Sequence, residues 1–196
     1  MSIFLIRHAE SEANINGKTQ SHASIALSEN GHLQARELRS RLPEIEHVIV
    51  SKYLRTHQTA APVLEKYRLK AEVNEHLHEF SYLSERKCAH TNLNDRKAWV
   101  DAYWEKMDFR HRDADDAESF EDLYLRVQAF HEKLKALAGS YAEKHLAVFS
   151  HGQFLQLLVM QVKQPMPLSK VLMQQFRLTI KLHSKTKNPP TRMYCM

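Results

Sequence analysis

Three short apolar runs, each ending abruptly in polar residues, constrain the fold of this chain most strongly. The runs are IFLIR at 3–7, HVIVS at 47–51 and LAVFS at 146–150. Continuous apolar stretches of this length are typical of strands covered on both faces, as in parallel sheets. The stretches KAEVNE at 70–75 and LTIKLH at 178–183 alternate, as half-buried or edge strands do. The sequence therefore predicts a largely parallel sheet with additional edge strands.

Helical patterns lie between these runs. Ser28 can cap a helix over 28–42, and 52–67 is a second candidate. The clearest helix spans 119–138, where apolar residues recur at three- and four-residue steps until Gly139 ends the pattern. A further helix is expected after the third apolar run. Strands that alternate with helices predict an α/β domain.

Length and charge set the domain organisation that we expect. A chain of 196 residues suits one compact domain, which we place at 1–184. Within it, 80–117 is the least regular section and is predicted to be an insertion over one sheet edge that selects substrate. Residues 185–196 are predicted to be a loose basic tail. The net charge of the chain is +5. Eight positive residues and no acidic residue follow Glu143, so the first 143 residues carry a net charge of −3. This asymmetry favours an anionic partner or substrate.

Several broad classes are disfavoured. Arg7 interrupts the first apolar run after four residues, so no secretory signal is expected, and the later apolar stretch at 154–162 is too short to span a bilayer. A soluble, cytoplasmic protein without a membrane partner is the expectation. Cys88 and Cys195 form no recognisable pattern and are predicted to be free thiols. The basic stretch 177–192 lacks interleaved aromatic residues, which disfavours nucleic acid as a partner.

Polar residues with catalytic potential follow the ends of the predicted strands. Arg7 and His8 end the first apolar run, and His151 follows the third. Arg55 lies one turn into the helix after the second run, and Glu79 lies just past another predicted strand. In open α/β sheets ligands bind at the carboxyl ends of the strands. These five side chains are therefore expected at one rim.

Their chemistry fits phosphoryl transfer. Two guanidinium groups present forked donors that match phosphate oxygens, and a helix starting at Gly152 would point free N–H groups at the same anion. Neighbouring positive charge lowers the pKa of a histidine, which keeps the ring neutral and nucleophilic. One imidazole can then attack phosphorus while the other binds an oxygen. Glu79 is the candidate acid for the departing alkoxide.

Six stretches carry a more specific signal and follow one another along nearly the whole domain. They are LIRHAESEAN at 5–14, LSENGHLQA at 27–35, VSKYLRTHQTA at 50–60, HEF at 78–80, ESFEDLYLRV at 118–127 and FSHG at 149–152. Together they resemble the histidine phosphatase superfamily, with its phosphoglycerate-mutase-like fold. The resemblance implies a three-layer α/β/α sandwich with a mostly parallel central sheet. Ala9 departs from the family, which usually has glycine there, and would be strained if the position needed a positive φ.

The resemblance also implies roles for individual residues. His8 resembles the nucleophile that becomes phosphohistidine, and Glu79 resembles the proton donor. Arg7, Arg55 and His151 resemble the rest of the phosphate pocket. Further substrate-binding candidates at the matching positions are Ser11, Asn14, Gly152 and Gln153. Neither a metal nor an organic cofactor is implied for hydrolysis.

Three functions remain open at this point. The first is a phosphomonoester hydrolase acting through phosphohistidine, the second a phosphoglycerate-type mutase, and the third a non-catalytic module that binds phosphorylated ligands. The run EFSYLSERK after Glu79 lacks the Glu-Arg-x-Tyr-Gly string of true mutases, which favours the phosphatase. The complete residue set argues against the binding module. The expected substrate is a phosphorylated small molecule, with sugar phosphates, nucleotides and phosphopeptides all possible, and the oligomeric state is left open. Residues expected at the entrance are Tyr82, Arg86, Lys87, Arg96 and Lys97.

Overall fold

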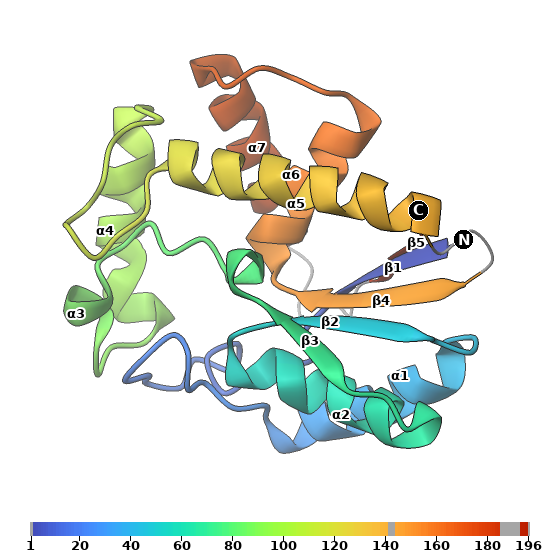
Figure 1. Ribbon diagram of the computed structural model, residues 1–196. Helices are drawn as coiled ribbons and strands as arrows, with labels where there is room; N and C mark the ends of the chain where they lie inside the picture. Colours follow the sequence, from blue (N-terminus) through green and yellow to red (C-terminus); the bar gives the residue numbers. More distant parts are fainter. Residues whose placement is uncertain (1, 141–143, 185–192, 196) are drawn as a thin grey trace.

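A five-stranded sheet forms the centre of the protein, whose structure is a computed structural model that describes residues 2–140, 144–184 and 193–195 (Figure 1). The strand order is β3-β2-β4-β1-β5. The first four strands in this order are parallel, and β5 runs antiparallel to β1 at the edge. The strands are β1 (Ser2–Arg7), β2 (His47–Ser51), β3 (Ala71–Asn74), β4 (His145–Ser150) and β5 (Met193–Cys195). The predicted mostly parallel sheet is therefore confirmed.

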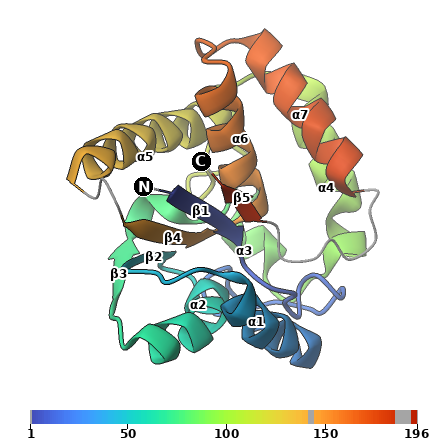
Figure 2. The same cartoon turned by 90° about the vertical axis from the view of Figure 1, so that its right-hand side faces the viewer.

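Helices cover both faces of the sheet. On one face lie α1 (Glu29–Arg41) and α2 (Leu54–Tyr67), which pack on Ile6, Val50 and other buried strand residues. On the other face lie α5 (Phe120–Ser140) and α6 (Gly152–Lys163), with α7 (Lys170–Ser184) against α6 on the outside (Figure 2). This arrangement confirms the predicted α/β/α sandwich. It also explains the continuous apolar runs, because successive strand side chains meet helices on opposite faces.

The helix starts follow their capping residues. The Ser28 hydroxyl accepts a hydrogen bond from the Gly31 N–H at 3.0 Å, as an N-cap should. A Cβ at Gly31 would lie 1.9 Å from the Glu10 carbonyl oxygen, so glycine is required where α1 meets the loop after β1. At its end α5 departs from expectation, because the helix continues through Gly139 to Ser140. Gly139 does not have the positive φ of a left-handed cap and is an ordinary residue of the last turn.

The predicted edge strand at 178–183 is wrong, because these residues belong to α7. The alternation of apolar residues there was short enough to fit either element. Leu178 is 62% exposed, so the alternating set does not form a buried strand face. The buried residues Leu172, Met173 and Phe176 lie three and four positions apart and form the packed face of a helix instead.

The segment 80–117 contains α3 (Glu85–Cys88) and α4 (Leu93–Lys106), and follows the short 3-10 helix η1 (Glu75–Leu77). Figure 1 shows α3 and α4 beyond the end of the sheet at which β1 and β4 finish. The segment thus lies over the rim where the polar residues were predicted to gather. It contributes its own apolar side chains, including Cys88 and Trp104, to the core beside α5 and α6.

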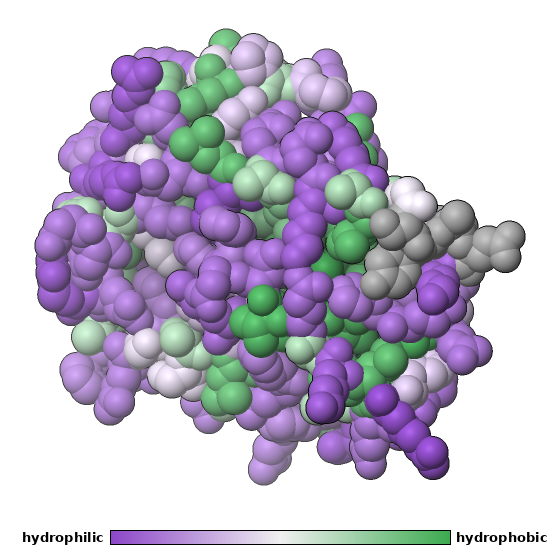
Figure 3. All heavy atoms as spheres, viewed as in Figure 1, coloured by the Kyte–Doolittle hydropathy of each residue, from purple (hydrophilic) through white to green (hydrophobic). Residues whose placement is uncertain are grey.

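The C-terminal residues differ from the loose tail that was predicted. Residues 185–192 lie outside the described residues, but Met193–Cys195 pair with β1 as the edge strand β5, so the prediction is wrong for these three. Cys88 and Cys195 are free thiols, as expected, with Cys88 buried and Cys195 exposed. None of the helices in the described part of the chain is long and apolar enough to cross a membrane. The face drawn in Figure 3 is mostly hydrophilic, with separate apolar patches.

Candidate active site

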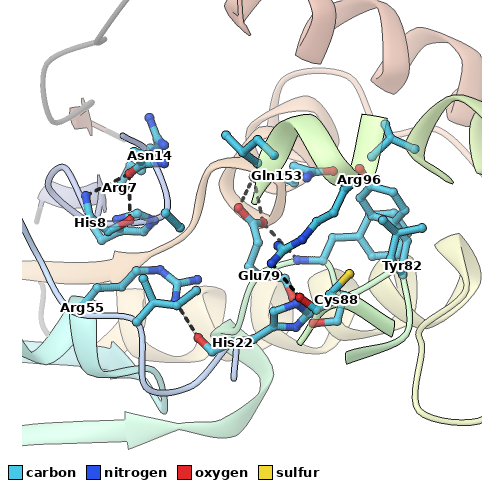
Figure 4. A pocket seen from close by; sticks show the side chains of 18 residues that line it. Arg7, His8, Asn14, His22, Arg55, Glu79, Tyr82, Cys88, Arg96 and Gln153 are labelled. Carbon is cyan, nitrogen blue, oxygen red and sulfur yellow. Dashed lines mark hydrogen bonds between the residues drawn. The ribbon is translucent and has the colours of Figure 1, made fainter. Parts of the chain in front are cut away.

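A pocket of about 220 Å³ opens at the carboxyl ends of the strands (Figure 4). It brings together residues that are far apart in the sequence but follow neighbouring strands. The predicted residues that line it are Arg7, His8, Ser11, Asn14, Arg55, Glu79 and Gln153. The topological rule that ligands bind at strand ends therefore located the pocket correctly.

His8 is held as a neutral imidazole with a defined tautomer. Its Nδ1 lies 2.7 Å from the carbonyl oxygen of Ala9. Because a carbonyl can only accept, Nδ1 carries the proton and the lone pair is on Nε2. Burial lowers the pKa of His8 well below its ordinary value, and the positive charges of Arg55 and Arg7 lower it further. The ring is thus neutral at pH 7 and suited to nucleophilic attack.

Ala9 is accommodated without backbone strain. It is not among the residues with a positive φ, so the departure from the family glycine has no conformational cost. Its N–H donates to the Thr59 hydroxyl on α2 at 3.0 Å, and that hydroxyl donates to the Arg55 carbonyl at 2.6 Å. This chain of hydrogen bonds ties the loop after β1 to the helix that carries Arg55.

His151 lies fully buried behind the pocket wall, with its ring centroid 5.2 Å from that of His8. Its Nδ1 accepts from Arg55 Nη2 at 3.0 Å, because a guanidinium can only donate. Its Nε2 then donates to the Ser51 hydroxyl at 2.7 Å. Burial lowers the pKa of His151 well below its ordinary value, and Arg55 and His8 add to this effect. Neither His151 nor Gly152 is part of the pocket lining, so their direct contact with a phosphate oxygen stays a prediction.

Arg55 is a buried cation of the site that is held by several contacts. Its Nη1 donates to the His22 carbonyl at 2.7 Å, and its guanidinium lies 4.9 Å from the centre of the Tyr53 ring. Burial lowers the pKa of Arg55 to about 10, and the negative charge of Glu79 opposes that change. The side chain therefore remains positively charged at neutral pH.

The Glu79 side chain follows η1 in the sequence and packs against the N-terminus of α6. Its Oε1 accepts hydrogen bonds from the backbone N–H of Phe80 at 3.0 Å and of Gln153 at 3.1 Å. A Cβ at Gly152 would lie 3.5 Å from Arg7 Nε and 3.8 Å from Glu79 Oε2. These are ordinary van der Waals distances, so a Cβ could be accommodated there, and the position of the carboxylate is set by its hydrogen bonds at the positive end of the α6 dipole.

Ser11 and Asn14 form a small hydrogen-bonded unit in the loop after β1. The backbone N–H and the hydroxyl of Ser11 donate to Asn14 Oδ1 at 3.1 and 3.0 Å. Because a backbone N–H can only donate, these bonds identify the amide oxygen and leave Asn14 Nδ2 as the group that can donate to a ligand. Ser11 therefore orients the asparagine, and both residues line the pocket.

The segment 80–117 contributes part of the wall. Of the five residues expected at the entrance, Tyr82 and Arg96 line the pocket. The other three form ion pairs away from it: Arg86 with Asp115, Lys87 with Asp113 and Lys97 with Asp101.

His22 also lines the pocket and was not predicted. Its backbone N–H donates to the Glu85 carboxylate at 2.7 Å, and its backbone carbonyl accepts from Arg55. Burial lowers the pKa of His22, with Glu85 opposing and Arg96 and Arg55 reinforcing the shift. Because these contacts join three distant segments, no local sequence pattern could have revealed them. Within residues 2–140, 144–184 and 193–195, no three His, Cys, Asp or Glu side chains gather closely enough to hold a metal ion.

Comparison with known proteins identifies the family to which this chain belongs. The sequence model of the histidine phosphatase superfamily (branch 1) matches residues 3–183. The chain belongs to the histidine phosphatase superfamily. It is 29% identical over 161 residues to the adenosylcobalamin/alpha-ribazole phosphatase of Salmonella typhi, covering 81% of this chain and 78% of that protein. It is 28% identical over 163 residues to a probable phosphoglycerate mutase of an Enterobacter species, covering 81% and 73%.

A solved structure from this superfamily has the same fold. The putative alpha-ribazole-5'-P phosphatase of Escherichia coli superposes with a TM-score of 0.70 at 26% identity, over 89% of this chain and 84% of that one. The predicted family and the predicted reaction class, a phosphatase, are thereby confirmed. The comparisons leave the substrate open.

Proposed function

We propose that this histidine phosphatase hydrolyses phosphomonoesters in two steps through a phosphohistidine on His8. In the first step Nε2 of His8 attacks phosphorus in line, the bond from phosphorus to the ester oxygen breaks, and Glu79 gives its proton to the departing alkoxide. In the second step Glu79 takes a proton from water, the water oxygen bonds to phosphorus, and the bond from phosphorus to Nε2 breaks. His8 returns to its neutral form and inorganic phosphate leaves.

The surrounding donors suit the charge that develops on the phosphoryl oxygens. Arg7 and Arg55 are the cations of the inner pocket, and Asn14 Nδ2 is a neutral donor beside them. Arg55 is held by His22 and His151 before any ligand binds, so little reorganisation is required. One such preorganised donor is commonly worth about 10²–10³ in rate. His151 would support the transition state through Arg55 and, once a phosphoryl group is bound, through its own ring.

One observation carries this proposal, namely the hydrogen bond from His8 Nδ1 to the Ala9 carbonyl. It leaves the lone pair on Nε2, and the burial of the ring beside two arginines disfavours the protonated form that could not attack phosphorus. A non-catalytic module that only binds phosphate would not need a neutral imidazole at this place, because a charged ring would bind the anion better.

A panel of phosphomonoesters tests the activity. It would contain sugar phosphates, nucleotides, phosphopeptides, alpha-ribazole phosphate and 3-phosphoglycerate, the last with and without a bisphosphorylated primer. We expect phosphate release by the wild type, inhibition by vanadate, and a radiolabelled phosphoenzyme that is stable in alkali and labile in acid. His8→Ala should abolish all three, whereas His76→Ala, which removes an exposed imidazole, should not.

The other outcomes of the panel are informative. Primer-dependent isomerisation of phosphoglycerate would indicate the mutase, as the Enterobacter relative is named. Binding without turnover would indicate the binding module. Release that survives His8→Ala would refute the phosphohistidine mechanism. We further propose that the segment 80–117 selects the substrate and that the protein acts in the cytoplasm on a small phosphorylated molecule.

A further inference from the structure

Arg96 of α4 is a third cation in the pocket, outside the pair proposed to serve the phosphoryl group (Figure 4). Its Nε donates to the Thr91 hydroxyl and its Nη2 to the Thr19 hydroxyl, both at 2.7 Å. Nη2 also lies 2.8 Å from the Thr91 carbonyl and 3.0 Å from the Cys88 carbonyl. Every one of these acceptors is neutral. Among the described residues no carboxylate lies within ion-pair distance of this guanidinium, so its charge is not offset locally.

The hydrogen bonds of Arg96 fix its position but leave one edge of the group available. Nη1 takes part in none of its bonds to the described residues. The tethers come from the loop that contains Thr19 and from the turn at 88–91, so the side chain is ordered before a ligand arrives. A preorganised guanidinium loses little conformational freedom on binding, and it matches carboxylate and phosphate oxygens.

The charge balance of the pocket indicates what Arg96 would bind. The charged residues of the described lining are Arg7, Arg55, Arg96 and Glu79. A phosphomonoester dianion balances the two inner arginines. Glu79 must be protonated to act as the acid of the first step, and in that state one positive charge remains. A partly buried cation without a counter-charge is unfavourable, so one further anionic group on the substrate would complete the balance.

The wall beside Arg96 is apolar. Leu93 and Val100 of α4, together with Tyr82, line the same pocket. Burial raises the pKa of Tyr82 to about 12, so its hydroxyl carries no charge at neutral pH. This surface suits the carbon chain or ring of an alcohol and offers no competing charge.

We propose that Arg96 binds a second anionic group, a carboxylate or a second phosphate, on the alcohol part of the phosphomonoester. An apolar spacer separates it from the phosphate that is cleaved. This inference rests on the proposed phosphatase function and defines its substrate class. It also gives the segment 80–117 a specific task, since α4 supplies the residue that distinguishes anionic from neutral alcohols.

Matched ester pairs test the proposal. The substrates are phosphate monoesters of straight-chain hydroxy acids with increasing spacer length, the corresponding carboxamides, and the bisphosphates of the matching diols. We expect kcat/KM to be about tenfold or more higher for an acid or a bisphosphate than for the carboxamide at the best spacer length, as a charge-assisted hydrogen bond would give. Preference for the carboxylate or for the bisphosphate identifies which anion Arg96 takes.

Variants then locate the preference. Arg96→Gln should reduce the ratio of kcat/KM for acid over carboxamide to about one, and Arg96→Lys should keep part of it. Lys97→Gln removes a neighbouring charge that lies outside the pocket and should leave the ratio unchanged. The ratio is measured on one protein sample, so a loss of folded protein cancels. An equal kcat/KM for acid, bisphosphate and carboxamide at every spacer length in the wild type would overturn this inference alone, whereas no turnover of any ester would overturn the proposed function.

Discussion

Replacement of Arg126 should slow the enzyme selectively on substrates that need a proton donor. Arg126 Nε and Nη2 pair with the two oxygens of Glu118 at 2.8 and 3.0 Å, and the side chains are 10% and 17% exposed. Arg126 Nη1 donates to the His78 carbonyl at 3.1 Å, and Glu118 accepts from the Ser81 N–H at 3.0 Å. The pair therefore holds the backbone on both sides of Glu79 and acts as a positioning unit for the proposed acid.

The magnitude follows from these contacts. Loss of one partner of a fully buried ion pair costs about 3–5 kcal/mol, and partial exposure lowers our expectation for Arg126→Gln to about 2–3 kcal/mol of unfolding free energy. A displaced acid loses much of the roughly 10²-fold or larger advantage of general acid catalysis. We therefore expect kcat for an alkyl phosphate to fall about 10- to 100-fold. The rate for p-nitrophenyl phosphate, whose leaving group departs as a stable anion, should change by less than about threefold.

The assay compares both esters on the same protein, alongside urea unfolding. Arg112→Gln is the matched control. Arg112 pairs with Asp122, which lies on α5 as Arg126 does, but the Arg112 side chain is half exposed. Adding Glu118→Gln to Arg126→Gln should recover part of the lost stability, because it removes the unpaired negative charge. Equal losses of activity on the two esters, in a protein that is still folded, would refute the positioning role.

Three further predictions concern stability. Burial is the chief cause that lowers the pKa of His78 to about 4, so the unfolded chain binds a proton that the folded protein rejects between pH 6.5 and 4. The His78 contribution to the fall in unfolding free energy over that range should be about 2–3 kcal/mol, and His78→Gln should make the urea-unfolding profile shallower by that amount, with His8 and His151 accounting for the rest. Ser51→Ala removes the partner of the buried His151 Nε2 and should lower the unfolding free energy by about 1–3 kcal/mol in urea unfolding, and an unchanged midpoint would contradict the buried hydrogen bond between the two side chains. Phe176→Ala should lower the unfolding free energy by about 3–5 kcal/mol, and Leu178→Ala should lower it by less than about 0.5 kcal/mol. A buried strand at 178–183 would instead predict a substantial loss of unfolding free energy for Leu178→Ala.

The sheet could be predicted because its signal is local. Strands β1, β2 and β4 are buried on both faces. A run such as LAVFS, which is bounded by polar residues, is too short to be a buried helix and is therefore predicted to be a strand. The segment 178–183 shows the limit of that reasoning, since three alternate apolar residues fit two periods equally well. Only the packing of Phe176 and Leu172 on α6 and α5 decides the matter, and packing is not visible in a window of six residues.

Some residues of the site could also be predicted from the sequence and others could not. Arg7 and His8 could be placed from their position at a strand end, because topology alone brings such ends together. His22 could not, because its place in the wall is fixed by bonds to α2 and α3. The orientation of His151 was equally out of reach. Sequence order indicated that it adjoins His8, but only the contacts with Arg55 and Ser51 reveal that its ring nitrogens are engaged by protein groups.

The two imidazoles of the site are controlled by different parts of the fold, and this separates attack from charge stabilisation. The tautomer of His8 is set by the carbonyl of its own neighbour, Ala9, so its acceptor is local even though the Ala9 N–H is bonded to Thr59 of α2. The tautomer of His151 is set by Arg55 on α2, and the Ser51 hydroxyl at the end of β2 accepts from the remaining ring N–H. A shift of α2 would therefore move the positive charge away from the phosphoryl oxygens while the nucleophile kept its lone pair. Changes in α2 should accordingly weaken phosphate binding and transition-state stabilisation together, without converting His8 to a non-nucleophilic tautomer.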